Sequence, residues 1–213
     1  MTSNLKLPTA QRPRIRWRGL AGAARALYLA RAASEAQAPL LILARDAATA
    51  ATLEEEIGFF APPELPVLVF PGYETLPYDQ FSPHPDITSH RLRALARMPT
   101  LRSGLVISDV QTAMQRLSPR SFIDGHALSL KTGDALDLES FRARLTTAGY
   151  ISVPQVAEPG EFAIRGSLFD IFPMGSEAPL RIDLFDREID TIRSFDPDTQ
   201  RSSDVLDQLE LLP

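Results

Sequence analysis

The sequence predicts an α/β protein in two parts, a parallel-sheet domain over residues 1–126 and a small α+β domain with an antiparallel sheet over residues 127–213. Three observations lead to this prediction. Short apolar runs alternate with helix-like segments in the first half, which is typical of βαβ units. That rhythm stops near residues 124–133, where one helical segment and then several short strands follow. The 213 residues are 44% hydrophobic, enough for a packed core.

The elements of the first part follow from apolar spacing and from the residues that start and stop helices. Asp46 precedes a helical pattern and is a favourable N-cap. Residues 71–85 hold four prolines, so we expect a loop there. The other predicted elements are a helix over Ala21–Ala33, a strand over Leu40–Ala44, a helix over Asp46–Phe60, a strand over Pro66–Phe70, a helix over Asp86–Met98, a strand over Leu105–Ser108 and a helix over Thr112–Leu117.

The second part is predicted to hold one helix, Leu138–Ala148, and then several strands. Turn residues separate these strands at Pro159-Gly160, Pro173–Ser176 and Asp196–Asp198. An antiparallel sheet is the arrangement that such short strands and turns favour.

Alternation along one of these strands predicts which way Arg165 points. Phe162 and Ile164 share one face, so Arg165 belongs to the other, solvent face. The apolar phase changes after Gly166, because Phe169 and Ile171 are the next apolar pair. A glycine bulge at this position would produce such a change.

A second strand, Arg181–Phe185, has Ile182 and Leu184 as its core pair. Arg181 and Phe185 then lie on the opposite face, and a phenylalanine beside an arginine on a solvent face is typical of a binding surface. The alternative is structural: packing covers Phe185, and Arg181 pairs with the neighbouring carboxylate of Asp183 or Asp186. Spacing alone leaves both interpretations open.

Composition excludes several classes of protein. The chain has no cysteine, so it has neither disulfides nor thiolate metal sites. No apolar run approaches the roughly 20 residues of a membrane span, and we expect a soluble, cytoplasmic protein. The formal charge of −5 argues against a nucleic-acid-binding domain that is basic throughout. The three histidines are too scattered to suggest a metal site.

The sequence lacks the usual motif for nucleotide binding and hydrolysis. A phosphate loop reads G-x-x-x-x-G-K-[ST], with a lysine that reaches the terminal phosphates and a hydroxyl that holds magnesium. The nearest segment is Gly19–Arg25, which contains Gly19 and Gly22. Ala23 and Ala24 follow Gly22, where the lysine and the hydroxyl residue are needed. We therefore expect a degenerate loop that does not bind ATP, and no catalytic residues.

The N-terminal run Arg12, Arg14, Arg16 and Arg18 alternates with Pro13, Ile15 and Trp17. Two interpretations stay open. The run is either an ordinary edge segment with its apolar residues docked inward, or an extended segment that shows a basic face to phosphates or to acidic protein. A contact with DNA would also use the tyrosines of the loop, Tyr73 and Tyr78.

Four stretches resemble a known family, the bacterial transcription-repair coupling factors (Mfd). They are ETLPYDQFSPH at Glu74–His84, AMQRLSP at Ala113–Pro119, GEFAIRGSLFDIFPMGSE at Gly160–Glu177 and LRIDLFDREIDTIRSFD at Leu180–Asp196. The resemblance is to the N-terminal region of that family, is weakest before Leu40, and extends to the excision-repair protein UvrB.

The resemblance implies a degenerate RecA-like domain over 1–126, without a working phosphate loop, and a UvrB-like domain over 127–213 that binds UvrA. Carried over residue by residue, the UvrA-binding positions are Arg165, Arg181 and Phe185. No cofactor is implied for this chain, because ATP and magnesium belong to a translocase motor outside it. In the full-length family, other domains bind RNA polymerase and DNA, and a C-terminal domain masks the UvrA site.

Three functions follow as hypotheses. The first is recruitment of UvrA, which would link a stalled RNA polymerase to nucleotide excision repair. The second is residual nucleotide binding by the RecA-like part. The third is direct DNA binding through the arginine run and the tyrosine loop.

Overall fold

A computed structural model describes residues 7–76 and 79–212. By its internal contacts the chain divides into two compact units. Unit 1 consists of Met1–Gly72 and Arg97–Arg116, and unit 2 of Tyr73–Ala96 and Leu117–Pro213. The chain thus leaves unit 1, contributes one helix to unit 2, returns, and passes into unit 2 again before the predicted boundary at residue 126. Tyr78 of the predicted loop lies outside the described residues.

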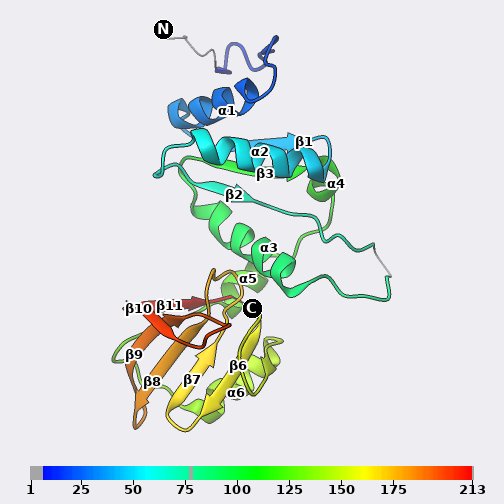
Figure 1. Ribbon diagram of the computed structural model, residues 1–213. Coiled ribbons are helices and arrows are strands. Elements are labelled where there is room, and N and C mark those ends of the chain that lie inside the picture. Colours follow the sequence, from blue (N-terminus) through cyan, green and yellow to red (C-terminus); the bar gives the residue numbers. More distant parts are fainter. Residues whose placement is uncertain (1–6, 77–78, 213) are drawn as a thin grey trace. The chain divides into compact units, whose positions relative to one another are not determined.

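Unit 1 is built on a three-stranded parallel sheet in the order β1-β3-β2, which confirms the predicted parallel sheet. Figure 1 shows α2 beside this sheet and α1 beside α2. All five residues of the central strand β3 are buried, as expected for a strand covered on both faces. The elements are α1 (Ala24–Glu35), β1 (Leu40–Ala44), α2 (Ala47–Phe60), β2 (Val67–Val69), the 3-10 turn η1 (Met98–Thr100), β3 (Leu105–Asp109) and α4 (Val110–Ala113).

Two aspartates start helices in unit 1. The predicted N-cap Asp46 accepts a hydrogen bond from the Thr49 backbone N–H at 2.8 Å. The hydrogen bonds from Thr49 lower the pKa of Asp46 to about 2. Asp109 caps α4, accepting from the backbone N–H of Thr112 at 3.0 Å and from its hydroxyl at 2.6 Å. Because this cap lies at the end of β3, α4 begins two residues before the predicted start.

The predicted helix Thr112–Leu117 is wrong in its extent, since α4 ends at Ala113. Two local features explain the early end. Met114 is 81% exposed, so a further turn would bury little apolar surface. Pro119 also follows closely, and the residue before a proline avoids helical geometry.

Unit 2 contains a six-stranded sheet in the order β10-β9-β8-β7-β6-β5 and a two-stranded ribbon of β4 and β11. All pairs in the larger sheet are antiparallel except β5 with β6, so the predicted antiparallel sheet is confirmed apart from one short edge strand. The elements are α3 (Pro85–Arg97), α5 (Arg120–His126), β4 (Leu128–Lys131), α6 (Leu138–Thr147), β5 (Ile151–Ser152), β6 (Glu161–Arg165), β7 (Leu168–Ile171), β8 (Leu180–Phe185), β9 (Glu188–Phe195), β10 (Ser202–Leu206) and β11 (Gln208–Leu211).

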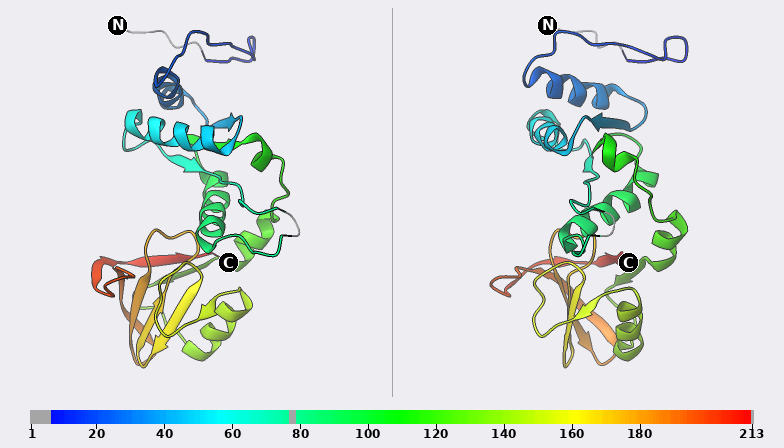
Figure 2. Two further views of the ribbon diagram at one scale, coloured as in Figure 1. Left: turned by 45° about the vertical axis from the view of Figure 1, so that its right-hand side comes forward. Right: turned by 90° about the vertical axis from the view of Figure 1, so that its right-hand side faces the viewer.

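The main core of unit 2 lies between one face of this sheet and α6 (Figure 2). Phe141 of α6 meets Phe169 of β7 edge to face, with 5.3 Å between the ring centroids. Beside this core, the Tyr150 hydroxyl donates to the Leu212 carbonyl at 2.7 Å and accepts from the Met174 N–H at 3.0 Å. Burial raises the pKa of Tyr150 to about 12, so the hydroxyl keeps its proton and holds the end of β11.

A two-residue hairpin turn, and not a glycine bulge, causes the phase change after Arg165. The register pairs Arg165 with Leu168 and Ile164 with Phe169, so the chain reverses direction at Gly166 and Ser167. Gly166 has φ +64°, the left-handed geometry that tight hairpin turns require. The predicted bulge is wrong, but the predicted outward direction of Arg165 is unaffected.

Candidate protein-binding face

The three predicted contact residues lie on one face of the six-stranded sheet, opposite the main core. In β8 the burial alternates, with Ile182 and Leu184 buried inside and Phe185 exposed. Arg181 stands directly opposite Asp170 of β7, and Asp170 opposite Ala163 of β6. Arg165 is two residues along β6 from Ala163, and therefore shares that face. We call this surface the outer face.

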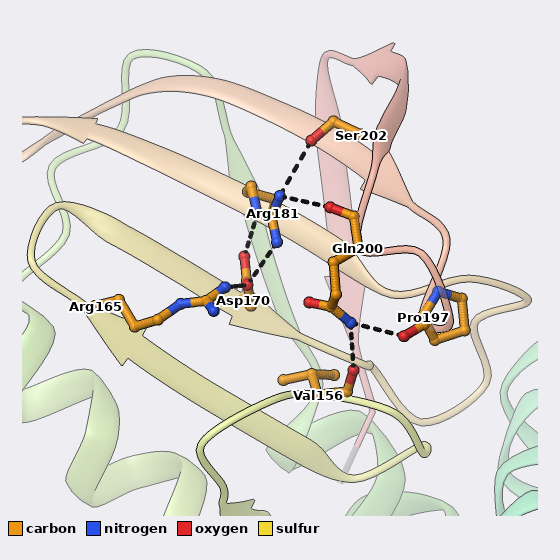
Figure 3. A network of polar contacts seen from close by, with 7 residues as sticks. All are labelled: Val156, Arg165, Asp170, Arg181, Pro197, Gln200 and Ser202. Carbon is orange, nitrogen blue, oxygen red and sulfur yellow. Dashed lines mark hydrogen bonds and ion pairs between the residues drawn. The ribbon is translucent and has the colours of Figure 1, made fainter.

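Asp170 is the centre of a charged network on the outer face (Figure 3). Its side chain is only 1% exposed. Arg181 binds both of its oxygens, through Nε to Oδ1 at 2.7 Å and Nη2 to Oδ2 at 2.9 Å. Arg165 donates from Nη2 to the same Oδ2. One carboxylate thus holds two guanidinium groups, and the three side chains carry a net charge of +1.

Arg181 is fixed by more than this ion pair. Its Nη1 donates to the Gln200 carbonyl at 3.1 Å, and its guanidinium lies over the Phe195 ring, 4.6 Å from the centroid. The hydrogen bond with Asp170 raises its pKa above the ordinary value for arginine. Only 18% of the side chain is exposed. The suggested pairing of Arg181 with Asp183 or Asp186 is wrong: its partner is the carboxylate directly across the strand pair.

A short turn supports this arrangement from one side. Asp196 accepts from the Thr199 N–H at 2.7 Å, which lowers the pKa of Asp196. The turn presents Gln200, whose Nε2 donates to the carbonyls of Val156 at 3.1 Å and Pro197 at 2.7 Å. Because the Gln200 carbonyl is one of the acceptors for Arg181, the turn helps to fix that guanidinium (Figure 3).

A small second core covers the adjacent part of the outer face. It consists of buried apolar residues from β6, β9 and the connecting segments, namely Val156, Ala163, Phe172 and Phe195. The hairpin end of the face stays open. There the Arg165 side chain is 46% exposed and Phe185 is 79% exposed. The outer face therefore has one covered, rigid part around Arg181 and one accessible part around Arg165 and Phe185.

Sequence reasoning placed the two arginines and the phenylalanine on one outward face but missed Asp170. A signal for Asp170 does exist. It stands between Phe169 and Ile171, both of which point into the core, so alternation places its carboxylate on the face of the arginines. Predicting this contact also requires the strand register. Asp170 lies opposite Arg181 because the chain makes a hairpin turn at Gly166.

The segment predicted to be a degenerate phosphate loop has a local fold of its own. Gly19 and Gly22 both have positive φ, and α1 begins just after them at Ala24. The Ala24 and Arg25 N–H groups donate to the carbonyls of Ala21 and Gly22. No strand precedes the loop within residues 7–23. This geometry gives no support to the nucleotide-binding hypothesis, because these two N–H groups already have acceptors.

Metal and membrane sites gain no support from the described part of the chain. Its side chains form no group of three or more His, Asp or Glu residues able to hold a metal ion. The side chain of His126 is outside that description. No helix among residues 7–76 and 79–212 is both long and apolar enough to cross a membrane.

Comparison with known proteins supports the resemblance found from the motifs. A family model described as the UvrB interaction domain matches residues 128–213. The chain is 46% identical over 194 residues to a transcription-repair-coupling factor of Escherichia coli, an alignment that covers 91% of this chain and 17% of the relative. The transcription-repair-coupling factor of Haemophilus influenzae is 49% identical over 147 residues, which are 69% of this chain and 13% of the relative. The transcription-repair-coupling factor of Bacillus subtilis is 29% identical over 195 residues, which are 92% of this chain and 16% of the relative. The chain thus spans about a sixth of the length of these relatives.

Proposed function

From the premise that this chain is a relative of the transcription-repair-coupling factors, with a UvrB interaction domain at residues 128–213, we propose that unit 2 binds UvrA through its outer face. The observation that carries the proposal is the exposure of both Arg165 and Phe185 at the same end of the outer face. A largely exposed phenylalanine and an accessible arginine on one face are an anchor and a charge of the kind that dominate protein interfaces.

The outer face assigns different tasks to its three residues. Phe185 is 79% exposed and is the group able to enter an apolar pocket of the partner. Arg165 keeps nearly half of its surface accessible while Asp170 fixes one of its nitrogens. Arg181 is mostly covered and has its donors engaged. We therefore assign direct contact to Phe185 and Arg165, and assign to Arg181 the support of Asp170.

Charge also defines the partner surface that fits. Residues 158–213 contain 13 acidic residues and five arginines, so the surroundings of the outer face repel acidic surfaces that dock elsewhere. A carboxylate placed at Arg165, beside an apolar pocket for Phe185, meets favourable charge against this acidic background. In a protein as long as these relatives, binding of this kind would connect a stalled RNA polymerase to excision repair, as the name of the relatives suggests. The chain itself would act as a binding module without catalysis.

Titration of UvrA against paired variants tests this proposal. Phe185→Ala should cost about 1–3 kcal/mol of binding free energy, roughly a 5- to 150-fold loss of affinity. Adding Arg165→Gln should weaken binding further, because a charge-assisted hydrogen bond is lost. The matched control is Val205→Ala with Arg142→Gln, since both residues are exposed in unit 2.

Circular dichroism and thermal melting should be alike for the two double variants. Undiminished affinity of the Phe185→Ala, Arg165→Gln protein would remove the outer face from the interface. An equal loss in the control would point to a general charge effect.

A further inference from the structure

The N-terminal end of this chain carries a net positive charge, unlike the remainder. Residues 1–34 contain Lys6 and six arginines but no aspartate or glutamate, and the first acidic residue is Glu35. The remaining residues hold 15 basic and 27 acidic side chains. A basic segment attached to an otherwise acidic protein is the charge asymmetry that accompanies nucleic-acid binding.

The structure shows how this segment is held. Residues 12–20 have no regular secondary structure, and Arg12, Arg14, Arg16 and Arg18 are all exposed. The alternating residues Ile15 and Trp17 are half-buried, so the segment has an inner apolar side and an outer basic side. Trp17 meets Tyr28 of α1 edge to face, at 6.3 Å between ring centroids. Both views in Figure 2 show the segment beside α1, on the side away from α2.

Helix α1 extends the basic surface. Arg25 and Arg31 are exposed and lie three residues before and after Tyr28, so they flank the point where the segment docks. The opposite side of the helix is occupied by the buried alanines Ala26, Ala30 and Ala33. We call the six side chains Arg12, Arg14, Arg16, Arg18, Arg25 and Arg31 the arginine strip.

The arginine strip differs from the outer face in how its charge is compensated. Among the residues that the structure describes, no carboxylate forms an ion pair with any of the six guanidinium groups. Each therefore keeps its full charge and its donors for an external anion. In an extended segment, alternate residues are about 6.6 Å apart, close to two rises of about 3.4 Å along one strand of B-DNA.

We propose that the arginine strip binds the phosphate backbone of double-stranded DNA. Four arginines in a row present a linear array of charge, which fits a regular polyanion better than the single carboxylate of a folded partner. Guanidinium groups form paired hydrogen bonds to phosphate oxygens. No described feature of the strip reaches into a groove to read bases, so binding is independent of sequence. Its role is to hold DNA close to unit 1.

The test is fluorescence anisotropy of a labelled duplex titrated with the full chain at several salt concentrations. With four to six phosphates neutralised, the slope of log affinity against log salt should be about −4 to −5. Replacing Arg12, Arg14, Arg16 and Arg18 by alanine should reduce the magnitude of that slope by about 3–4 and weaken low-salt binding about 100-fold or more. Replacing the same four by lysine should keep most of the slope, because the charge is retained.

A matched control separates the strip from net charge. Arg142, Arg144, Arg187 and Arg201 are exposed, and changing all four to alanine alters the net charge by the same amount. We expect this control to keep the slope of the unmodified chain. Equal losses in the two quadruple variants would overturn the proposal. So would competition by polyglutamate as strong as that by unlabelled duplex, which would make an acidic protein the ligand.

This proposal is independent of the outer face. The quadruple alanine variant of the strip should titrate UvrA with unchanged affinity, and the Phe185→Ala variant should bind DNA normally. Either proposal can therefore fail without the other.

Discussion

Arginine serves opposite purposes in the two units. Arg181 on the outer face of unit 2 is 18% exposed and binds both oxygens of a buried carboxylate. Arg16 in the arginine strip of unit 1 is exposed, with no carboxylate paired to it among the described residues. The first fixes the geometry of a surface, whereas the second supplies charge to it. Replacing Arg181 should therefore destabilise unit 2, whereas replacing Arg16 should change only ligand binding.

The largest expected effect is that of Asp170→Ala. Removing one partner of a buried ion pair leaves the other uncompensated, which costs about 3–5 kcal/mol when both are fully buried. We expect about 2–4 kcal/mol here, because Arg165 is half exposed and water can solvate it. Urea unfolding followed by circular dichroism measures this loss.

Asp170→Asn is the companion variant, because it keeps an oxygen acceptor for Arg181 and should lose less stability than Asp170→Ala. If Asp170→Ala left the unfolding midpoint unchanged, the contrast between the two kinds of arginine would be wrong.

A smaller loss of stability is expected for Asp109→Ala, because the Asp109 carboxylate accepts hydrogen bonds from an N–H and a hydroxyl and, within the part of the chain that the structure describes, forms no ion pair with a guanidinium group. Burial acts to raise the pKa of Asp109, but the hydrogen bonds from Thr112 outweigh it and the pKa is lowered. A lowered pKa in the folded state stabilises the protein above the ordinary value near 4, and this contribution is lost as the pH falls through the folded-state value. Asp109→Ala should cost about 1 kcal/mol at neutral pH.

Thermal melts between pH 7 and pH 3 provide the readout for Asp109. The difference between Asp109→Ala and the unmodified chain should shrink as the pH falls. A difference that stays constant down to the lowest pH would show that capping by the carboxylate is not its origin.

The smallest effects on stability are expected for Arg165→Ala and Arg16→Ala. Arg165 shares Asp170 with Arg181, which retains its two hydrogen bonds to the carboxylate, and exposed ion pairs contribute about 0–1 kcal/mol. Arg16 has no such pair, so its removal should change the free energy of unfolding by less than about 0.5 kcal/mol. A large loss for Arg16→Ala, in the same urea titration, would mean that the strip is structural.

Much of the fold follows from local patterns. The strand Leu40–Ala44 was predicted with the bounds observed, and the cap at Asp46 set the start of α2. These two predictions succeeded because apolar periodicity and helix capping depend on residues that are close together in the sequence. The extent of α4 failed for the opposite reason, since its end depends on whether residues such as Met114 find anything to pack against.

The outer face shows the same difference between features set by local sequence and features set by distant contacts. Alternation within β8 predicted the exposure of Phe185, which needs no knowledge of neighbouring strands. The partner of Arg181 could not be predicted, because Asp170 lies on another strand and the register depends on one turn. Whether Gly166 ends a strand or only bends it decides that register, and both are ordinary uses of glycine.

The tight turn at Gly166 and Ser167 also has a consequence for how the outer face assembles. Arg165 lies five residues from Asp170, and Asp170 lies 11 from Arg181. The sheet of unit 1 instead pairs Leu40 with Leu105, across a long stretch of chain. Closing a short loop costs less entropy than closing a long one, and proteins rich in local contacts fold faster. We therefore expect the hairpin β6–β7 to bring Arg165 and Asp170 together early in folding, before the distant strands of the parallel sheet meet.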